Sequence, residues 1–165
     1  MVHLTKIYTK TGDEGYTSNA KNQRLFKTDP IMEAIGAVDE ANSAIGMAID
    51  EYNDIIERVQ SDLFDLGAEL AGAPTINISE NRIIYLENVI DDYNEYLEPL
   101  RSFVLPTGPL HNARTIVIRS EREVWKIENI NLNIPKYLNR LSDLLFVMAR
   151  YHNKGKEKLW VPNNG

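Results

Sequence analysis

The sequence predicts an all-α protein, a five-helix bundle of the ferritin-like, up-and-down type with an irregular N-terminal arm. Two observations support this class. Apolar residues recur three and four positions apart through five successive segments, and only short connections separate those segments. The chain has 165 residues, enough for one domain with a sizeable core. We therefore expect a single domain, in which residues 1–28 form the arm, residues 29–153 the bundle and residues 154–165 a loose C-terminal tail.

The first three helices are defined by their ends as well as by their apolar stripes. Asp29 and Pro30 form an N-cap followed by proline at the first helical position, so the first helix is predicted to begin there. The second keeps the helical spacing over residues 56–70 and ends near a Gly-Ala-Pro sequence. The third is predicted over residues 79–97, with a serine as its candidate cap and Pro99 as its stop.

The last two helices carry the strongest patterns. The fourth is predicted from Pro106 to about Asn129. The fifth is predicted to start at Pro135. Its inward face comprises Tyr137, Leu138, Leu141, Leu144, Leu145 and Met148. Apolar helix faces of this regularity can fill the core of a monomer, or they can also form an interface between subunits. Periodicity alone favours an ordinary core.

Composition excludes several classes of function. The net charge of −6 argues against nucleic acid as the main partner. The chain has no cysteine, and its histidines, His3, His111 and His152, do not fall at metal-ligand spacing, so we expect no metal site built by the protein alone. No stretch approaches the length of a membrane span and no apolar leader is evident, which predicts a cytoplasmic protein that is not bound to a membrane.

The sequence TKTGDEGYTS, residues 9–18, has no apolar face. Its glycines can expose backbone N–H groups to an anion, Lys10 adds a charge, and four hydroxyls can bind phosphate oxygens or a magnesium shell. Asp13 would repel phosphate, and the stretch is not a GxxxxGK[ST] P-loop. Local chemistry alone is more typical of a tight turn than of a phosphate site.

The fourth predicted helix gathers charged side chains on one side. Arg114, Ile118 and Glu121 share one stripe, with His111 and Arg122 beside it, and another arginine lies further round. Such a face is usually solvated and held by pairs of opposite charge. An arginine cluster held by a glutamate also suits a polyphosphate, and the absence of lysine from this face slightly favours that hypothesis.

The fifth predicted helix places Asn139, Arg140 and Asp143 within an apolar sequence. The arginine and the aspartate are three positions apart and can simply pair with each other. The asparagine can cap a neighbouring helix or contact an adenine edge, and the structural role is favoured.

Six stretches of the chain, taken in order, resemble the PduO-type ATP:cob(I)alamin adenosyltransferases. The resemblance extends from about residue 6 to residue 152, and the combination is specific although each stretch alone is weak. The stretches are TKTGDEGYTS, EAIGAVDEANSAIG (33–46), FDLGAEL (64–70), FVLPTGP (103–109), HNARTIVIRSER (111–122) and YLNRLSDLLFVMAR (137–150).

The resemblance implies an enzyme that transfers the 5′-deoxyadenosyl group of ATP to the cobalt of cob(I)alamin and releases triphosphate, with Mg²⁺ accompanying the nucleotide. It also implies a homotrimer with ATP between neighbouring subunits and an N-terminal arm that binds the nucleotide. A flavoprotein reductase or an adenosylcobalamin-dependent enzyme is the expected protein partner.

The resemblance also assigns roles to individual residues. The nucleotide-binding positions are Thr9, Lys10, Thr11, Gly12, Thr17, Ser18, Lys27, Arg119, Glu121, Arg122 and Asn139. Arg119 also counts among the catalytic positions. Asp39 and Arg114 match a salt bridge across the subunit boundary, and Phe103 matches a phenylalanine near the corrin ring that helps exclude a lower axial cobalt ligand.

One position departs from the family pattern. The family usually has two consecutive arginines where this chain has Ile118 and Arg119, so one phosphate-facing cation is missing. Two alternatives therefore stay open: an ATP-binding regulatory helical bundle without transferase activity, and a structural bundle that only oligomerises.

Overall fold

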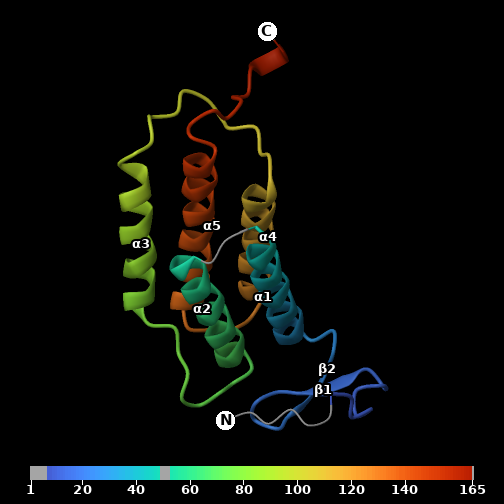
Figure 1. Ribbon diagram of the computed structural model, residues 1–165. Helices are drawn as coiled ribbons and strands as arrows, with labels where there is room; N and C mark the ends of the chain where they lie inside the picture. The colour runs from blue at the N-terminus through green and yellow to red at the C-terminus, as the bar shows by residue number, and fades with distance from the viewer. Residues whose placement is uncertain (1–6, 49–52, 165) are drawn as a thin grey trace.

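The computed structural model describes residues 7–48 and 53–164, and in these residues the chain folds into a bundle of five α-helices (Figure 1). The all-α prediction is confirmed. The helices are α1 (Pro30–Met47), α2 (Asp54–Leu70), α3 (Glu80–Asn94), α4 (Pro109–Val124) and α5 (Asn133–His152). The arm contains a short antiparallel hairpin of β1 (Tyr16–Ser18) and β2 (Arg24–Phe26), and a 3₁₀ turn, η1 (Pro162–Asn164), lies near the C-terminus.

Capping and backbone conformation fix where the helices begin. Asp29 caps α1 as predicted, since its carboxylate accepts a hydrogen bond from the backbone N–H of Ile31 at 2.9 Å. The fourth helix begins at Pro109 and not at Pro106, because Gly108 between them has a positive φ of 84° that no helix contains.

The end of the fourth helix and the start of the fifth also differ from the prediction. The fourth helix ends at Val124, and the residues that follow form turns in which Asn129 has a positive φ of 57°. The fifth helix begins at Asn133, two positions before Pro135, because proline is tolerated throughout the first helical turn. The side chain of Asn131 accepts a hydrogen bond from the backbone N–H of Asn133 at 3.0 Å and so supports this start.

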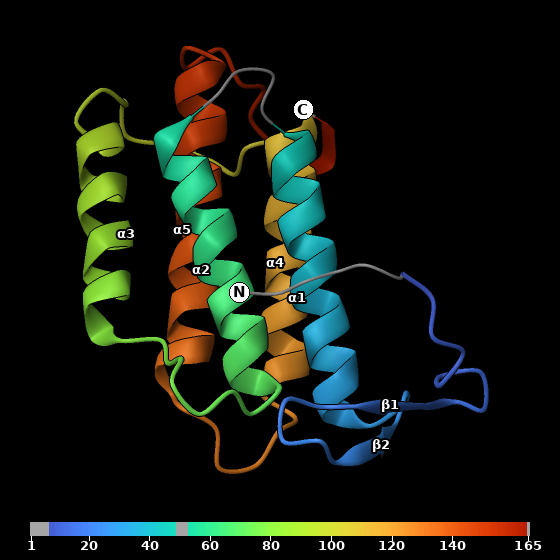
Figure 2. The same ribbon diagram turned by 60° about the horizontal axis from the view of Figure 1, so that its bottom comes forward.

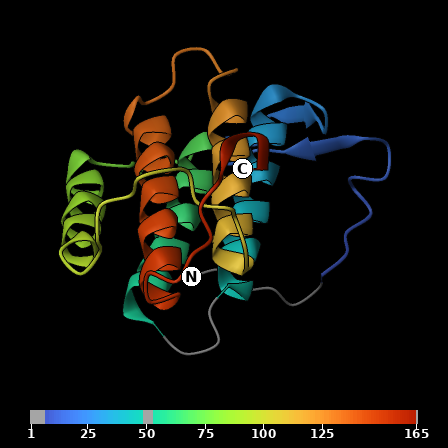
Figure 3. The ribbon, with the colours of Figure 1, turned by 90° about the horizontal axis from the view of Figure 1, so that it is seen from above.

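Packing joins the helices in a chain of neighbours: α2 on α1, α1 on α4, α4 on α5 and α5 on α3 (Figures 2 and 3). Small residues bring α1 and α4 close together, and Ser120 on α4 donates a buried hydrogen bond to the carbonyl of Ala37 on α1 at 2.6 Å. The fifth helix lies between α3 and α4 and buries most of its length. The functional residues of α4 are therefore carried on a rigid element that is supported from two sides.

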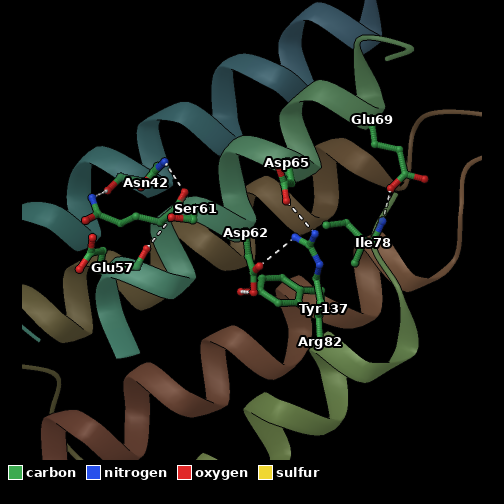
Figure 4. A network of polar contacts seen from close by, with 10 residues as sticks. Asn42, Glu57, Ser61, Asp62, Asp65, Glu69, Ile78, Arg82 and Tyr137 are labelled. Carbon is green, nitrogen blue, oxygen red and sulfur yellow. Dashed lines mark hydrogen bonds and ion pairs between the residues drawn. The ribbon is translucent and has the colours of Figure 1, made fainter. Parts of the chain in front are cut away.

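A buried polar network attaches α3 to the bundle (Figure 4). Arg82 on α3 forms ion pairs with Asp62 at 2.8 Å and Asp65 at 2.7 Å on α2. The buried hydroxyl of Tyr137 donates to the second oxygen of Asp62 at 3.0 Å. Burial raises the pKa of Asp62, while the hydrogen bond from Tyr137 and the charge of Arg82 lower it. Both carboxylate oxygens of Asp62 thus have a partner that offsets part of their desolvation.

The C-terminal segment corrects one expectation, because it is docked and not loose. Arg150 and Glu157 form an ion pair at 2.6 Å with side chains only 7% and 6% exposed. Beyond it, Leu159 pairs with Val104, and the backbone N–H of Trp160 donates to the carbonyl of Phe103 at 2.7 Å. A buried arginine requires a counter-ion, and Glu157 provides it only when the segment folds back.

The hairpin of the arm lies at the end of the bundle where α1 begins and α2 ends (Figure 2). The backbone N–H of Ala20 donates to the carbonyl of Ala71 at 2.9 Å, and the stem of Lys21 packs against Gly72. The arm is thereby held against its own bundle. Within residues 7–48 and 53–164, no helix is both long and apolar enough to cross a bilayer.

Candidate functional site

The glycine- and hydroxyl-rich loop of the arm is held against Lys27. A Cβ atom added to Gly12 would lie 3.2 Å from the Nζ atom of Lys27, so the ammonium group lies directly beside the loop backbone. The hydroxyls of Thr9 and Thr11 are 2.9 Å apart, and Lys10 has a left-handed φ of 62°. The structure therefore brings together loop residues and a lysine that are well separated in the sequence.

Backbone contacts fix this loop and leave its side chains outside. The N–H groups of Asp13 and Gly15 bond to the carbonyls of Lys10 and Gly12 at 3.5 and 3.3 Å, which makes the tight turn that local composition favours. The side chain of Arg24 donates to the carbonyl of Thr11 at 2.9 Å. The loop can be a tight turn and still bind an anion, because its exposed lysine and threonine side chains remain available to a ligand.

Arg119 on α4 is held by a carboxylate of α1. Its guanidinium forms an ion pair with Glu40, and both side chains stay partly exposed, at 40% and 54%. Arg122 lies one turn further along α4 and is exposed. The face thus presents two guanidinium groups, of which one is oriented before any ligand arrives.

The neighbouring part of the face lies between α4 and α5. The side chain of Glu121 accepts a hydrogen bond from the indole N–H of Trp125 at 3.1 Å. Asn139 is exposed on α5. Burial raises the pKa of Asp143 on the same helix; the charge of Arg140 lowers this pKa, and the charge of Glu121 raises it. The carboxylates of Glu121 and Asp143 therefore interact across α4 and α5, whereas the side chain of Asn139 contacts Arg140 of its own helix.

Arg140 does not pair with the aspartate three positions along its helix. Its Nε atom forms an ion pair with Glu87 of α3 at 2.7 Å, and one of its guanidinium nitrogens lies 3.4 Å from the side-chain oxygen of Asn139. The structural role that the sequence favoured for Arg140 is therefore correct, but its partner is on a different helix.

Asp39 and Arg114, expected to pair across a subunit boundary, have separate environments in one chain. Asp39 is exposed on α1. Arg114 is half-buried on α4, and its Nε atom is buried without a hydrogen-bond partner among the residues described. Asp39 and Arg114 do not form an ion pair with each other within the described part of the chain.

Arg114 also lines a cleft beside Phe103. The cleft has a volume of about 620 Å³, and Phe103 is 77% exposed at its edge. The ring of Trp160, brought there by the C-terminal segment, lies 6.1 Å from that of Phe103. His111 and Phe146 complete the aromatic lining and contact each other edge to face at 5.8 Å.

His111 is a buried and neutral part of this lining. Burial lowers its pKa, the nearby charge of Arg114 lowers it further, and Glu157 acts in the opposite direction. Its Nδ1 atom is buried and has no hydrogen-bond partner in the described part of the chain. The cleft is therefore aromatic and weakly polar, suited to a flat and mostly apolar ligand.

In the described residues, the arrangement offers cationic and aromatic side chains and not a cluster of metal ligands. The chain has no cysteine, and the described residues contain no group of three or more histidine or carboxylate side chains that could hold a metal ion. What α4 offers is a guanidinium in an aromatic cleft, at Arg114, and another on a cationic face, at Arg119. Five residues separate them, which is about 7.5 Å of helical rise.

The sequence did not reveal three of these features. Each of them depends on how distant parts of the chain fold together. They are the pairing of Arg119 with Glu40, the contact of Phe103 with Trp160, and the pairing of Arg150 with Glu157. Glu40 follows Asp39 directly, but no local signal distinguishes a carboxylate that pairs from one that is solvated.

The cobalamin adenosyltransferase family profile matches residues 7–152. The corrinoid adenosyltransferase of Mycobacterium leprae is 40% identical over 187 aligned positions, which cover 98% of this chain and 98% of that protein. The corrinoid adenosyltransferase of Mycobacterium tuberculosis H37Rv is 42% identical over 99 residues, and this match spans 52% of the chain but only about half, 51%, of that relative.

Solved structures give the same result at the level of the fold. A phenylalanine-to-alanine variant of the PduO-type ATP:corrinoid adenosyltransferase from Lactobacillus reuteri, complexed with cobalamin and ATP, has a TM-score of 0.83 and 35% identity, covering 96% of this chain and all of that one (100%). An arginine-to-lysine variant of that enzyme, complexed with ATP, has a TM-score of 0.85 and 35% identity over 94% and 100% of the two chains.

Proposed function

This chain belongs to the cobalamin adenosyltransferase family, and from that premise we propose that it transfers the 5′-deoxyadenosyl group of ATP to the cobalt of a reduced corrinoid. One observation carries the proposal. A single helix, α4, contributes Arg114 to an aromatic cleft and, about 140° further around its axis, Arg119 to a cationic face, so one element carries groups for a flat ring and for a nucleotide.

The nucleotide end of the site combines the arm with α4. Two groups of side chains make up this end. The first, on the arm, comprises Lys10, Lys27, the backbone of Gly12 and the hydroxyls of Thr9, Thr11, Thr17 and Ser18. The second, on α4 and α5, comprises Arg119, Arg122, Glu121 and Asn139. The arm is docked at the end of its own bundle, whereas Arg119 is held by α1. We propose that a triphosphate is bound between the arm of one subunit and the α4 face of the next.

A homotrimer follows from that arrangement as part of the proposal. The exposed carboxylate of Asp39 and the half-buried side chain of Arg114, which belongs to no ion pair among the described residues, support an ion pair across the boundary. The carboxylate would meet the exposed part of the guanidinium, since the Nε atom is covered within one chain.

Electron counting explains why the site needs no protein base. The reduced cobalt supplies the electron pair of the new cobalt–carbon bond to the 5′ carbon, the carbon–oxygen bond breaks, and triphosphate leaves with that bonding pair. The protein therefore has two tasks, to align the two reactants and to stabilise the negative charge that develops on the leaving oxygen. Lysine, arginine and backbone N–H groups perform the second task.

The aromatic cleft performs the first task. Phe103 and Trp160 offer a surface for the corrin, and their side chains give the cobalt no lower axial ligand. Mg²⁺ is proposed to arrive on the triphosphate, with the hydroxyls of Thr17 and Ser18 as available oxygen ligands. We propose that a flavoprotein reductase supplies the reduced corrinoid and that an adenosylcobalamin-dependent enzyme accepts the product. We also propose that the protein acts in the cytoplasm.

A single-turnover assay tests the proposal. Cob(I)alamin reduced separately and mixed with MgATP under anaerobic conditions should give the spectrum of an alkylated corrinoid and one triphosphate for each product. Unchanged absorbance with fully reduced substrate would contradict it.

An ATP-binding regulatory bundle is the second candidate, favoured by Ile118 alone. This half-buried isoleucine occupies the position next to Arg119 where the family usually has another arginine. Calorimetry that detects tight ATP binding in a protein that never turns over would select this candidate.

A further inference from the structure

A second cleft adjoins the Phe103 cleft, and the proposed function leaves it unused. Its volume is about 730 Å³, and it lies between the α3–α4 connection and the segment after α5. Leu100 and Arg101 line both clefts, so the two clefts adjoin at these residues.

The floor of the second cleft is an aromatic shelf made by two tyrosines. Tyr151 lies 6.1 Å from Tyr96 and 5.0 Å from Tyr93, with its ring edge to face against each, and it also contacts His152 at 5.9 Å. The rings of Tyr96 and Tyr151 remain 75% and 43% exposed. Exposed, mutually supported rings offer a stacking surface for a planar ligand.

The rim of the second cleft carries cations that have no assigned role. Arg101 and Lys154 are exposed, and neither belongs to an ion pair among the residues the structure describes. Arg150, deeper in the cleft, is neutralised by Glu157. The carboxylate of Glu98 is the remaining acid of the lining. The balance of free charge is therefore positive, and an anion with one negative charge fits it.

A planar base and a single negative charge occur together in one part of the proposed substrate. Cobalamin carries a nucleotide tail, in which a phosphodiester links the corrin to a benzimidazole base. Reduction to cob(I)alamin makes the cobalt square-planar, so the base no longer binds the metal and the tail is free. A corrin seated against Phe103 must place this tail somewhere nearby.

We propose that the second cleft binds the nucleotide tail of the reduced corrinoid. The base stacks on the ring of Tyr151 with the ring of Tyr96 against its edge, and the phosphodiester lies between Arg101 and Lys154. Because Arg101 lines both clefts, the corrin site and the tail site are neighbours at this residue. This inference rests on the proposed function and makes the cleft a determinant of which corrinoid the enzyme prefers.

The test compares cob(I)alamin with cob(I)inamide, which has no nucleotide tail, as substrates of the parent enzyme and of variants. Tyr151→Ala should lower kcat/KM for cob(I)alamin about tenfold, the effect of losing one base–aromatic stack. Lys154→Gln, an exposed change that does not threaten the fold, should lower it about threefold through loss of one contact to the phosphate. Neither variant should change kcat/KM for cob(I)inamide.

Two control variants separate a direct role from a structural one. Tyr151→Phe keeps the stacking ring, and Lys158→Gln removes a nearby cation outside the cleft, so both should retain the parent's ratio of cob(I)alamin to cob(I)inamide activity. Equal losses on the two substrates, or an unchanged ratio in Lys154→Gln and Tyr151→Ala, would overturn the tail site while the transferase function stands. Failure of the parent to adenosylate either corrinoid would overturn both.

Discussion

Arg119 of α4 and Glu40 of α1 form an ion pair across the contact between these two helices. The pair is half-exposed, so its contribution to stability is small, about 1 kcal/mol or less. Its effect on function is larger in this account, because it holds a guanidinium on the cationic face before the triphosphate arrives. An oriented donor needs no rearrangement when charge develops on the leaving group.

Removal of this guanidinium should therefore affect catalysis much more than folding. Arg119→Ala is expected to lower kcat by roughly 100- to 1000-fold, the range for loss of one oriented donor to a developing anion. Thermal unfolding should shift by only a few degrees. Lys126→Ala, which breaks the exposed ion pair to Glu123 further along the chain, serves as the control and should retain full activity. A loss of stability in Arg119→Ala that matches the loss of activity would make the arginine architectural.

Gly12 should be required because Lys27 lies against it. In Gly12→Ala the new methyl group would lie 3.2 Å from the Nζ atom of Lys27 and 3.3 Å from the carbonyl of Tyr16, so the ammonium must move. We expect a KM for ATP raised about tenfold, with unfolding little changed, as measured by steady-state kinetics and denaturant titration. Gly36→Ala is the matched control, since an added Cβ there meets nothing within 4 Å. Equal KM values in the two variants would argue against a role for the loop.

His111 should make the protein less stable in mild acid. Its pKa is lowered from 6.5 by burial and by the charge of Arg114, so the unfolded chain binds a proton more readily than the folded one. Stability from this group is complete above pH 6.5 and is lost as the pH falls through the lowered pKa.

The comparison that isolates this effect uses His111→Gln. Between about pH 7.5 and about pH 5.5, the free energy of unfolding should fall less in the variant than in the parent. The raised pKa of Asp62 makes the free energy of unfolding rise as the pH falls, which is the opposite effect, but it is present in both proteins and so does not alter the comparison. Identical slopes would mean that the histidine titrates alike in both states.

Glu157 should keep the C-terminal segment docked. Burial raises the pKa of its carboxyl, but the hydrogen bond from Arg150 and the charge of that guanidinium outweigh burial and lower it. Glu157→Gln leaves a buried arginine without its counter-ion, a change that costs up to about 3–5 kcal/mol unless the segment detaches.

Detachment is the expected result, and limited proteolysis detects it. Trypsin should cleave after Lys156 and Lys158 faster in Glu157→Gln than in the parent, and the KM for corrinoid should rise because Trp160 leaves Phe103. Lys156→Gln removes an exposed neighbour and should leave the cleavage rate after Lys158 unchanged. Equal rates of cleavage in the parent and Glu157→Gln would contradict a role for the ion pair.

The sequence predicted those parts of the fold that depend on local chemistry. The start of α1 was predicted correctly because Asp29 and Pro30 act within one turn. The start of α4 was wrong by three residues, since Gly108 can adopt either sign of φ and only packing selects one. The docked C-terminal segment was missed because Glu157 resembles any surface glutamate until Arg150 is seen to be buried.

The membership of the site remains a prediction from the sequence, whereas the structure supplies the contacts of those residues. Motifs in order identified the arm loop and α4, and the structure adds that Lys27 lies against Gly12. The pair of Arg119 with Glu40 joins residues 79 positions apart, and no periodicity encodes such a contact. Contacts between subunits are even harder to predict from sequence. A helix face that packs against another subunit can have the same residue pattern as a face that is exposed to solvent.

Mixing two inactive variants tests the central claim most directly. Lys10→Ala disables the arm and Arg119→Ala disables α4, so each protein alone should show little adenosyl transfer. If the site is shared between subunits, unfolding and refolding the two chains together creates mixed trimers in which some sites combine an intact arm with an intact α4. We predict that anaerobic assays with cob(I)alamin and MgATP recover a substantial fraction of the parent's activity in the refolded mixture. Activity that stays at the level of the separate variants would contradict the shared site.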